Sequence, residues 1–163
     1  MIDVNIRNVV EDDFLEISCL AENCNPMSTM TNSVYHLFTK HFKNTSFVVE
    51  NRSSHEILGF LLGFISQDDP NESYIHLLCM DPILRGKGVS KILIGTFIQT
   101  VSQIGCKEVK LVTKPHNTIS IKFYTKMGFK SYPSDKTVEI DGINIQEDYD
   151  GHEDDKIIFT KQI

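Results

Sequence analysis

The hydrophobic positions of the chain fall into short runs with two different spacings. Seven runs are alternating or continuously apolar and rich in β-branched residues, which is typical of strands. They cover residues 3–9, 45–50, 56–66, 73–80, 109–112 and 156–160, with one more strand starting at Phe129. Four runs repeat at helical spacing, over residues 11–23, 32–42, 89–104 and 117–127. The predicted order is therefore β-α-α-β-β-β-α-β-α-β-β.

Turn residues separate these runs and indicate how the strands connect. Asn25-Pro26 breaks the first helix, and the polar stretch 51–54 joins two strands as a hairpin. Gly59 and Gly63 stand inside a strand, which indicates close backbone approach or a bulge. The strand–helix–strand unit from residue 74 to residue 112 predicts a parallel crossover, so the sheet is expected to be mixed.

The amino-acid composition limits the classes of function that this chain can have. The chain has 163 residues, 40% of them hydrophobic and 23% charged, which suits one domain over residues 1–163 with a core that needs no disulfide. A net charge of −6 disfavours binding to nucleic acid and to anionic membrane surfaces. The four cysteines match no zinc spacing, and we expect buried free thiols in a reducing cell. Without a signal peptide or a long apolar run, a cytoplasmic protein is expected.

The most informative stretch follows the buried strand at 73–80 and opens the helix at 89–104. It reads Asp81-Pro-Ile-Leu-Arg85-Gly86-Lys87-Gly88-Val89-Ser90-Lys91. A helix N-terminus presents unpaired amides and partial positive charge, so it binds anions. Gly86 and Gly88 would let the backbone approach a phosphate closely. The stretch matches neither GxxxxGK[ST] nor GxGxxG, and a plain glycine-rich turn is the alternative interpretation.

A second stretch lies on the helix at 117–127. Asn117 stands where it can cap the helix, and Tyr124 lies two turns further along the same face. A phenol stays protonated at neutral pH and can donate a proton to a leaving thiolate. The alternative interpretation is that Tyr124 is a half-buried core residue.

Together the two stretches resemble the GNAT superfamily of N-acetyltransferases. The family's loop pattern Arg/Gln-x-x-Gly-x-Gly/Ala reads Arg85-Gly86-Lys87-Gly88-Val89-Ser90 here, with Ser90 in place of Gly or Ala. The later pattern Asn-x-x-Ala-x-x-Phe/Leu-Tyr reads Asn117-x-x-Ser120-x-x-Phe123-Tyr124, followed by Gly128-Phe129. The resemblance is strongest over residues 73–131.

The resemblance implies a fold, a reaction and a set of binding residues. The fold is α/β, a central mixed sheet flanked by helices on both faces. The reaction transfers an acetyl group from acetyl-CoA to a primary amine by direct attack in a ternary complex, with no metal. Binding of acetyl-CoA is carried over to Leu78, Cys79, Met80, Arg85, Gly86, Lys87, Gly88, Val89, Ser90, Lys91 and Asn117.

The resemblance also implies catalytic roles. The Met80 amide would polarise the thioester carbonyl and Tyr124 would protonate the CoA thiolate. A base is needed for the amine, and His76 is the candidate, because strand alternation places it on the face of Leu78 and Met80. The alternative for His76 is a structural histidine. Cys79 has no charge partner nearby in sequence, which disfavours it as a nucleophile.

The resemblance indicates only the broad chemical class of the binding partners. The acceptor is a small-molecule or peptide amine, with no nucleic acid and no membrane, and a homodimer is left open. A non-catalytic acyl-CoA-binding or sensing module on the same fold is the main alternative. Calcium binding by residues 148–155 is a further one, although Gly151 stands at the wrong position for an EF-hand. Residues 135–155, the acidic segment, carry a balance of −8, typical of a solvated loop or of a wall that attracts a cationic amine.

Overall fold

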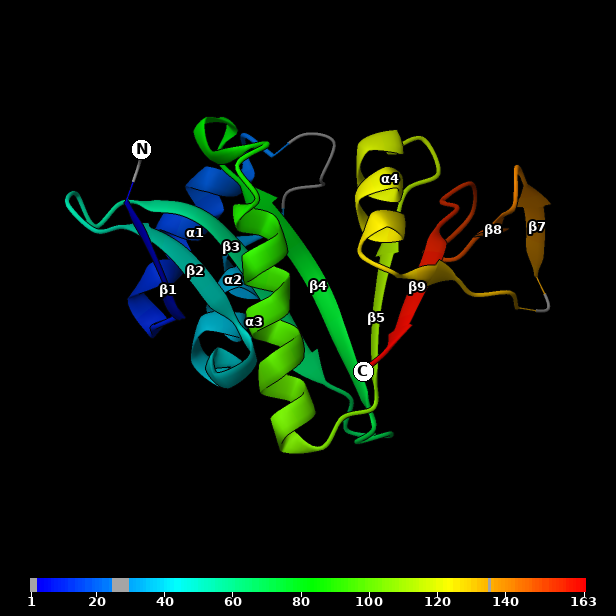
Figure 1. Ribbon diagram of the computed structural model, residues 1–163, viewed down its shortest axis with the longest axis horizontal. Helices are drawn as coiled ribbons and strands as arrows, with labels where there is room; N and C mark the ends of the chain where they lie inside the picture. Colours follow the sequence, from blue (N-terminus) through cyan, green and yellow to red (C-terminus); the bar gives the residue numbers. More distant parts are fainter. Residues whose placement is uncertain (1–2, 25–29, 135) are drawn as a thin grey trace. The chain divides into compact units, whose positions relative to one another are not determined.

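The chain divides into two compact units. The computed structural model describes residues 3–24, 30–134 and 136–163 (Figure 1). The first unit spans Met1–Cys106 and the second Lys107–Ile163. The predicted break at Asn25-Pro26 and residue Asp135 of the acidic segment lie outside the described residues. That residues 1–163 form a single domain stays a prediction.

The first unit contains a four-stranded antiparallel sheet and three α-helices. Its strands follow the order β1-β2-β3-β4. The elements are β1 (Val4–Asn8), η1 (Glu11–Asp13), α1 (Phe14–Ala21), α2 (Asn32–His41), η2 (Lys43–Thr45), β2 (Phe47–Asn51), β3 (Ile57–Ile65), β4 (Glu72–Met80), η3 (Pro82–Leu84) and α3 (Val89–Ile104). Among the described residues, no helix has the length and apolar composition needed to cross a membrane.

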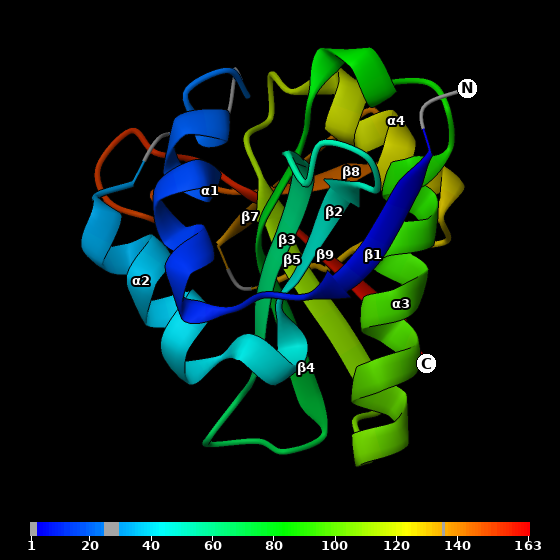
Figure 2. The same cartoon turned by 90° about the vertical axis from the view of Figure 1, so that its left-hand side faces the viewer.

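Helices cover both faces of this sheet, as the sequence predicts. Figure 2 shows α1 and α2 on one side of β2–β4 and α3 on the other. On the α1–α2 side, Ile17, Tyr35 and Phe38 pack with Phe60, Leu62, Leu77 and Cys79 of the sheet. On the α3 side, Phe97 lies over Gly63 of β3. The apolar faces of both helix layers therefore have a partner in the sheet.

A β-bulge interrupts the pairing of β3 with β4. Leu62 pairs with Leu77 and Gly63 with Ile75, so His76 is the extra residue on β4. The glycine at the bulge is required for space, because a Cβ at Gly63 would lie 2.5 Å from the Phe97 ring and 2.9 Å from the Tyr74 carbonyl oxygen. The prediction of close backbone approach or a bulge at the strand glycines is confirmed at Gly63, with the extra residue on the neighbouring strand β4.

Buried hydroxyl groups hold the backbone at this bulge. Thr45 Oγ1 donates to the Gly63 carbonyl at 2.7 Å, and Ser46 Oγ lies 3.3 Å from both the amide nitrogen and the carbonyl oxygen of Gly63. Thr45 ends the 3-10 helix η2, which is why β2 begins at Phe47 and not at residue 45 as predicted.

The second unit contains a three-stranded antiparallel sheet, a two-stranded hairpin and one helix. The strand orders are β5-β9-β6 and β7-β8. The elements are β5 (Glu108–Thr113), α4 (Thr118–Lys126), β6 (Lys130–Ser131), β7 (Thr137–Ile140), β8 (Ile143–Gln146) and β9 (Ile157–Gln162). Phe129 and Phe159 are buried with Tyr124 in the core of this unit.

The hairpin of β7 and β8 is absent from the order predicted by the hydrophobic pattern. Asp141 and Gly142 form its two-residue turn, with φ values of 51° and 76°. Two successive positive φ values define a type I′ turn, for which Asp-Gly is a preferred pair. The dipeptide between alternating apolar residues was therefore the local signal for this hairpin.

Candidate functional site

The end of β4 leads directly into the loop that begins α3. The Asp81 amide donates to the Leu58 carbonyl at 2.8 Å, and Asp81 Oδ1 accepts from the Ile83 amide at 2.8 Å. Pro82 follows at the first position of η3, where its fixed φ suits a helix start. Leu84 is buried and anchors the turn. The loop that follows is therefore held at its start by both backbone and side-chain contacts.

The two loop glycines adopt conformations that other residues rarely adopt. Gly86 has a φ of 72° and Gly88 a φ of 79°, and a Cβ at either position would meet no atom within 4 Å. Their backbone is therefore both left-handed and open to an approaching group. Gly88 is the N-cap of α3, where it provides no side-chain oxygen to bond the first amides.

The N-terminus of α3 has the features of an anion-binding surface. In the described part of the chain, no group accepts a hydrogen bond from the amides of Gly88, Val89 or Ser90. Arg85, Lys87 and Lys91 are exposed around them. Unpaired amides, the partial positive charge of the helix and three side-chain cations together favour a group with several negative charges.

Residues 78–80 of β4 lie beside this loop. The Arg85 Nε donates to the Met80 carbonyl at 3.4 Å, which connects the loop to the end of the strand. Met80 covers Gly59 on the α3 side of the sheet, where a Cβ at Gly59 would lie 2.6 Å from the Met80 sulfur. Of the predicted binding residues, the first unit thus brings together the strand end and the loop.

His76 does not share a face with Met80, and that part of the prediction was wrong. The His76 ring stacks on Phe38 of α2, with ring centroids 5.2 Å apart and planes 7° apart. Leu77 and Cys79 lie on the same α1–α2 side. Simple alternation fails because the bulge at His76 adds one residue to β4 and reverses the faces on either side of it.

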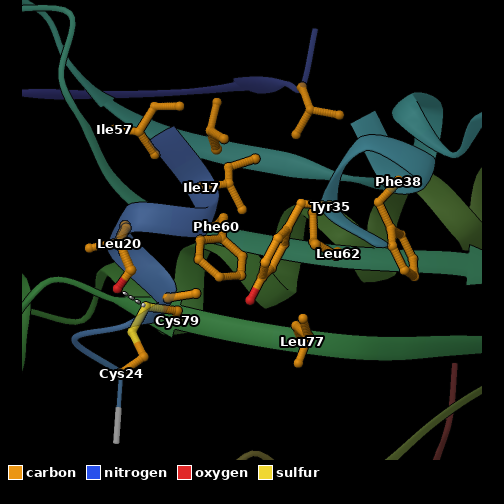
Figure 3. Close-up of a cluster of buried hydrophobic side chains, with 13 residues drawn as sticks. Ile17, Leu20, Cys24, Tyr35, Phe38, Ile57, Phe60, Leu62, Leu77 and Cys79 are labelled. Atoms are coloured by element: carbon orange, nitrogen blue, oxygen red, sulfur yellow. Dashed lines mark hydrogen bonds between the residues drawn. A yellow bond between two sulfur atoms is a disulfide. The ribbon is translucent and has the colours of Figure 1, made fainter. Parts of the chain in front are cut away.

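Two of the four cysteines are paired, which corrects the expectation of free thiols. Cys24 and Cys79 form a disulfide, with their Cα atoms 5.8 Å apart (Figure 3). Cys19 and Cys106 are free, and burial raises the pKa of the Cys106 thiol. The pair escapes sequence reasoning because 55 residues separate its members and only the fold places α1 beside β4. The bond also leaves Cys79 without a free thiolate, against a nucleophilic role.

In the second unit, Asn117 caps helix α4 as predicted. Its Oδ1 accepts a hydrogen bond from the Ser120 amide at 3.1 Å. An asparagine side chain has one acceptor oxygen and two amide donors. Because the oxygen is used by the cap, the Nδ2 amide provides the donors that Asn117 can offer to another group.

Tyr124 lies on the same helix in an apolar environment. Its ring packs against Phe123, Phe129 and Phe159, with centroids 5.3, 5.7 and 5.9 Å away. The residue is 7% exposed, and burial raises the pKa of its phenol above the ordinary value. Among the described residues, no partner makes a hydrogen bond with the hydroxyl, and its oxygen is not one of the buried polar atoms without a partner, so it is open to solvent. The group is thus a neutral phenol with its proton free to be donated.

The end of α4 fixes the position of Tyr124. The Phe129 amide donates to the Tyr124 carbonyl and the Gly128 amide to the Thr125 carbonyl, both at 3.0 Å. Gly128 has a φ of 84°, so this is a Schellman motif. Lys161 Nζ donates to the Met127 carbonyl at 2.8 Å and closes the same end. Gly128 therefore closes the helix directly after the predicted range 117–127.

The acidic segment is organised around one buried lysine. Lys156 is 6% exposed, and its Nζ bonds to Asp154 and lies 3.2 Å from Asp150 Oδ2. An ammonium group therefore occupies the position between two of the carboxylates proposed for calcium. Within the ranges that the structure describes, no group of three or more His, Cys, Asp or Glu side chains is placed to hold a metal ion.

Comparison with known proteins places these features in a family. The sequence profile described as "Acetyltransferase (GNAT) family" matches residues 12–129. An L-2,4-diaminobutyric acid acetyltransferase of Nocardia farcinica is 24% identical over 112 residues, 69% of this chain and 57% of that protein. The chain spans 57–63% of the length of the curated relatives that it matches.

Solved structures share the fold. A diaminobutyrate acetyltransferase of Paenibacillus lautus, in complex with L-2,4-diaminobutyric acid and coenzyme A, has a TM-score of 0.75 at 17% identity, covering 98% of this chain and 95% of that one. The ribosomal-protein-S18-alanine N-acetyltransferase of Escherichia coli has a TM-score of 0.73 at 15% identity, covering 99% and 94%. The predicted fold class is thereby confirmed.

Proposed function

Because the chain belongs to the acetyltransferase (GNAT) family, we propose that it transfers an acetyl group from acetyl-CoA to a primary amine. The observation that carries the proposal is the N-terminus of α3, where unpaired amides, open glycines and three cations converge. These features fit a pyrophosphate and the remaining phosphate charge of a CoA ester. Acetyl-CoA would supply the acetyl group as an activated thioester.

Two further groups are proposed to hold the pantetheine arm. The backbone of Leu78–Met80 would pair with the arm's amides as an added strand does, and the Met80 amide would polarise the thioester carbonyl. The Asn117 Nδ2 would donate to a carbonyl of the arm, since Asn117 Oδ1 is bonded to the Ser120 amide. Both interactions use backbone or amide dipoles, so they need no titrating group.

Proton transfers are proposed for one residue in each unit. Tyr124 would donate its proton to the departing thiolate, a role supported by its neutral, buried phenol. His76 is proposed as the base that receives a proton from the amine. Its stacking on Phe38 places its ring on the α1–α2 side of β4, so we expect the acceptor amine to approach from that side.

The acceptor belongs to the class of small-molecule or peptide amines. Relatives with small acceptors are named for L-2,4-diaminobutyric acid, whereas other neighbours are named for acetylation of proteins. No residue of the described site selects between these two classes of amine. A panel of candidate acceptors must therefore contain both small-molecule amines and peptides. The acidic segment would attract a cationic acceptor, although Lys156 already neutralises part of its charge.

We predict that acetyl-CoA stabilises the protein and that Gly88→Glu removes the effect. A ligand at 100 times its Kd adds about 2.7 kcal/mol of stability. For a chain of this size that corresponds to a rise in Tm of roughly 5–10 °C. Glutamate at position 88 would be strained at a φ of 79° and would repel phosphate. Thermal unfolding with and without acetyl-CoA measures the effect.

The matched control is Gly142→Glu in the turn of β7 and β8. Gly142 has a φ of 76° and open space around it, so the strain and charge change are the same as at Gly88. Its response to acetyl-CoA should equal that of the wild type. Release of free CoA with a panel of diamino acids and peptides then separates an enzyme from a non-catalytic binding module. No thermal shift at millimolar acetyl-CoA would contradict the proposal.

A further inference from the structure

The Cys24–Cys79 disulfide joins helix α1 to the strand proposed to bind acetyl-CoA. Cys79 lies in β4 between Leu78 and Met80, whose backbone we propose to pair with the pantetheine arm. Cys24 ends the turn that follows α1, where its amide donates to the Ala21 carbonyl at 3.0 Å. The bond therefore ties the cofactor strand to a segment 55 residues away in sequence.

The surroundings of the pair suit both of its oxidation states. Cys24 is 7% and Cys79 3% exposed, and they lie with Leu20 and Phe60 in the core between the sheet and the two helices (Figure 3). The Cys79 sulfur lies 3.8 Å from the Leu20 carbonyl oxygen, which can accept a weak hydrogen bond from a thiol. The reduced pair would thus be accommodated as two small apolar groups, one of them with a partner.

Stability of the fold does not require the bond. A chain of 163 residues buries enough apolar surface to fold without a disulfide, unlike small secreted domains. The bond adds a covalent restraint between α1 and β4 in the oxidised state alone. What changes with oxidation state is therefore the freedom of residues 78–80.

We propose that Cys24 and Cys79 are a reversible thiol–disulfide pair that sets the affinity of the protein for acetyl-CoA. The inference rests on the proposed function, because the affected strand is the one assigned to the pantetheine arm. In the oxidised form the tether holds β4 in position, and in the reduced form the strand can shift against α1. Since coupling between two equilibria is reciprocal, bound acetyl-CoA favours the disulfide by the same factor.

The redox step balances with a low-molecular-mass thiol as reductant. One thiolate attacks a sulfur of the disulfide, forming a mixed disulfide and releasing the other cysteine as a thiolate. A second thiolate attacks the outer sulfur of the mixed disulfide and releases the first cysteine. The products are two cysteine thiols, which have taken up two electrons and two protons, and the disulfide of the small thiol. Because both sulfurs are buried, the turn of residues 20–24 must open for the attack.

The test compares binding of acetyl-CoA to the oxidised and the reduced wild-type protein. Acetyl-CoA is a suitable probe because it has no free thiol, and a phosphine reduces the disulfide without attacking the thioester. Calorimetry should give a Kd roughly tenfold higher for the reduced form, within the usual range of coupling between sites. Peptide mass spectrometry verifies that Cys24 and Cys79 are linked in one sample and free in the other.

Two variants and three outcomes decide the inference. Cys24→Ser should bind like the reduced wild type whatever the redox state, whereas Cys19→Ser, an exposed cysteine outside the pair, should keep the redox dependence. Equal Kd values for the two wild-type forms would overturn the coupling and leave the proposed function intact. Failure of Cys24 and Cys79 to form the disulfide under oxidising conditions would also overturn the proposed redox coupling. Absence of binding in both forms would overturn the proposed function itself, and the coupling with it.

Discussion

Tyr124 combines the packing of a core residue with a phenol that is proposed as a proton donor. Its ring packs with Phe129 and Phe159, while within the described residues its hydroxyl has no hydrogen-bond partner. Removing a hydroxyl of this kind costs little stability, because no protein hydrogen bond is lost. The two alternatives drawn from the sequence, core residue and acid, are therefore compatible at this position.

We predict that Tyr124→Phe lowers kcat by about 10²-fold or more, as expected for loss of a general acid. The Tm and the stabilisation by acetyl-CoA should stay unchanged, since the ring packing is kept. Because burial raises the pKa of Tyr124, the wild-type phenol stays protonated between pH 7 and pH 9 and should impose no alkaline loss of activity there. Steady-state kinetics across this range, with the exposed Tyr132→Phe as control, tests this role. Unchanged turnover would remove Tyr124 from the chemistry.

At the scale of elements, strand β3 meets helix α3 at a glycine with no room for a methyl group. We predict that Gly63→Ala lowers the free energy of unfolding by about 1–2 kcal/mol. Overpacking costs about 1–3 kcal/mol, and it outweighs the roughly 0.4–1 kcal/mol gained by restricting the unfolded chain. The clash is with the Phe97 ring and with the Tyr74 carbonyl, which as backbone cannot turn away. Urea unfolding measures the change.

The control for this prediction lies in the same helix. Gly95 is inside α3, and a Cβ there would meet no atom within 4 Å. Gly95→Ala should therefore raise the free energy of unfolding, by up to about 1 kcal/mol, from helix propensity alone. If both alanine variants stabilised the protein, close packing at Gly63 would be refuted.

The elements also show which parts of the fold the sequence could predict. The bounds of α3 follow from the local spacing of apolar residues and were predicted, and Gly105 caps its end. The side on which His76 lies was not, because a bulge depends on the register between two strands. The Cys24–Cys79 pair depends on long-range packing in the same way. The β7–β8 hairpin is different, because Asp141-Gly142 is a local signal for its turn that the hydrophobic pattern does not contain.

The candidate site was predictable to a similar extent. The loop at residues 85–91 and the cap at Asn117 are local features, and the structure has both where they were expected. The roles of these residues toward acetyl-CoA stay proposals, because a sequence pattern specifies backbone geometry and charge more directly than it specifies a ligand. The acceptor is not encoded in any motif of the chain.

At the scale of the whole molecule, the charge is unevenly distributed. The acidic segment has nine acidic residues and one basic residue, a balance of −8, while the other residues sum to +2. Lys156 binds this segment to β9. Its burial lowers its pKa, but the hydrogen bonds that Lys156 donates to Asp154 and Asp150 outweigh that effect and the net pKa is raised. The bond from Lys156 in turn lowers the pKa of Asp154.

The directions of these two pKa shifts define the pH range in which Asp154 and Lys156 stabilise the folded protein. Asp154 has a lower pKa folded than unfolded, so its contribution is present above about pH 3.9 and is lost as the pH falls through the folded value. Lys156 has a higher pKa folded, so its contribution is present below about pH 10.4 and is lost as the pH rises through the folded value. Both contributions are therefore complete across the neutral range.

We predict that Lys156→Met moves the midpoint of acid unfolding to higher pH, because Asp154 would regain an ordinary pKa. Lys136→Met, which removes the same charge from an exposed position of the acidic segment, should leave the midpoint near that of the wild type. Circular dichroism between pH 2 and pH 7 measures both. Coincident shifts in the two variants would mean that net charge, and not the Lys156 ion pairs, governs acid stability.

The bulge at His76 also determines which genetic changes β4 can tolerate. Because His76 is the extra residue of the bulge, deleting it would leave Leu77 opposite Leu62 and Ile75 opposite Gly63, with regular alternation between them. Every other residue of β4 would keep its side of the sheet, and the loss would be the ring that stacks on Phe38. Deleting a different residue of β4 would instead shift the strand on one side of the deletion by one position, and each shifted residue would change sides. The strand therefore tolerates a single-codon deletion at the bulge better than a deletion elsewhere along its length.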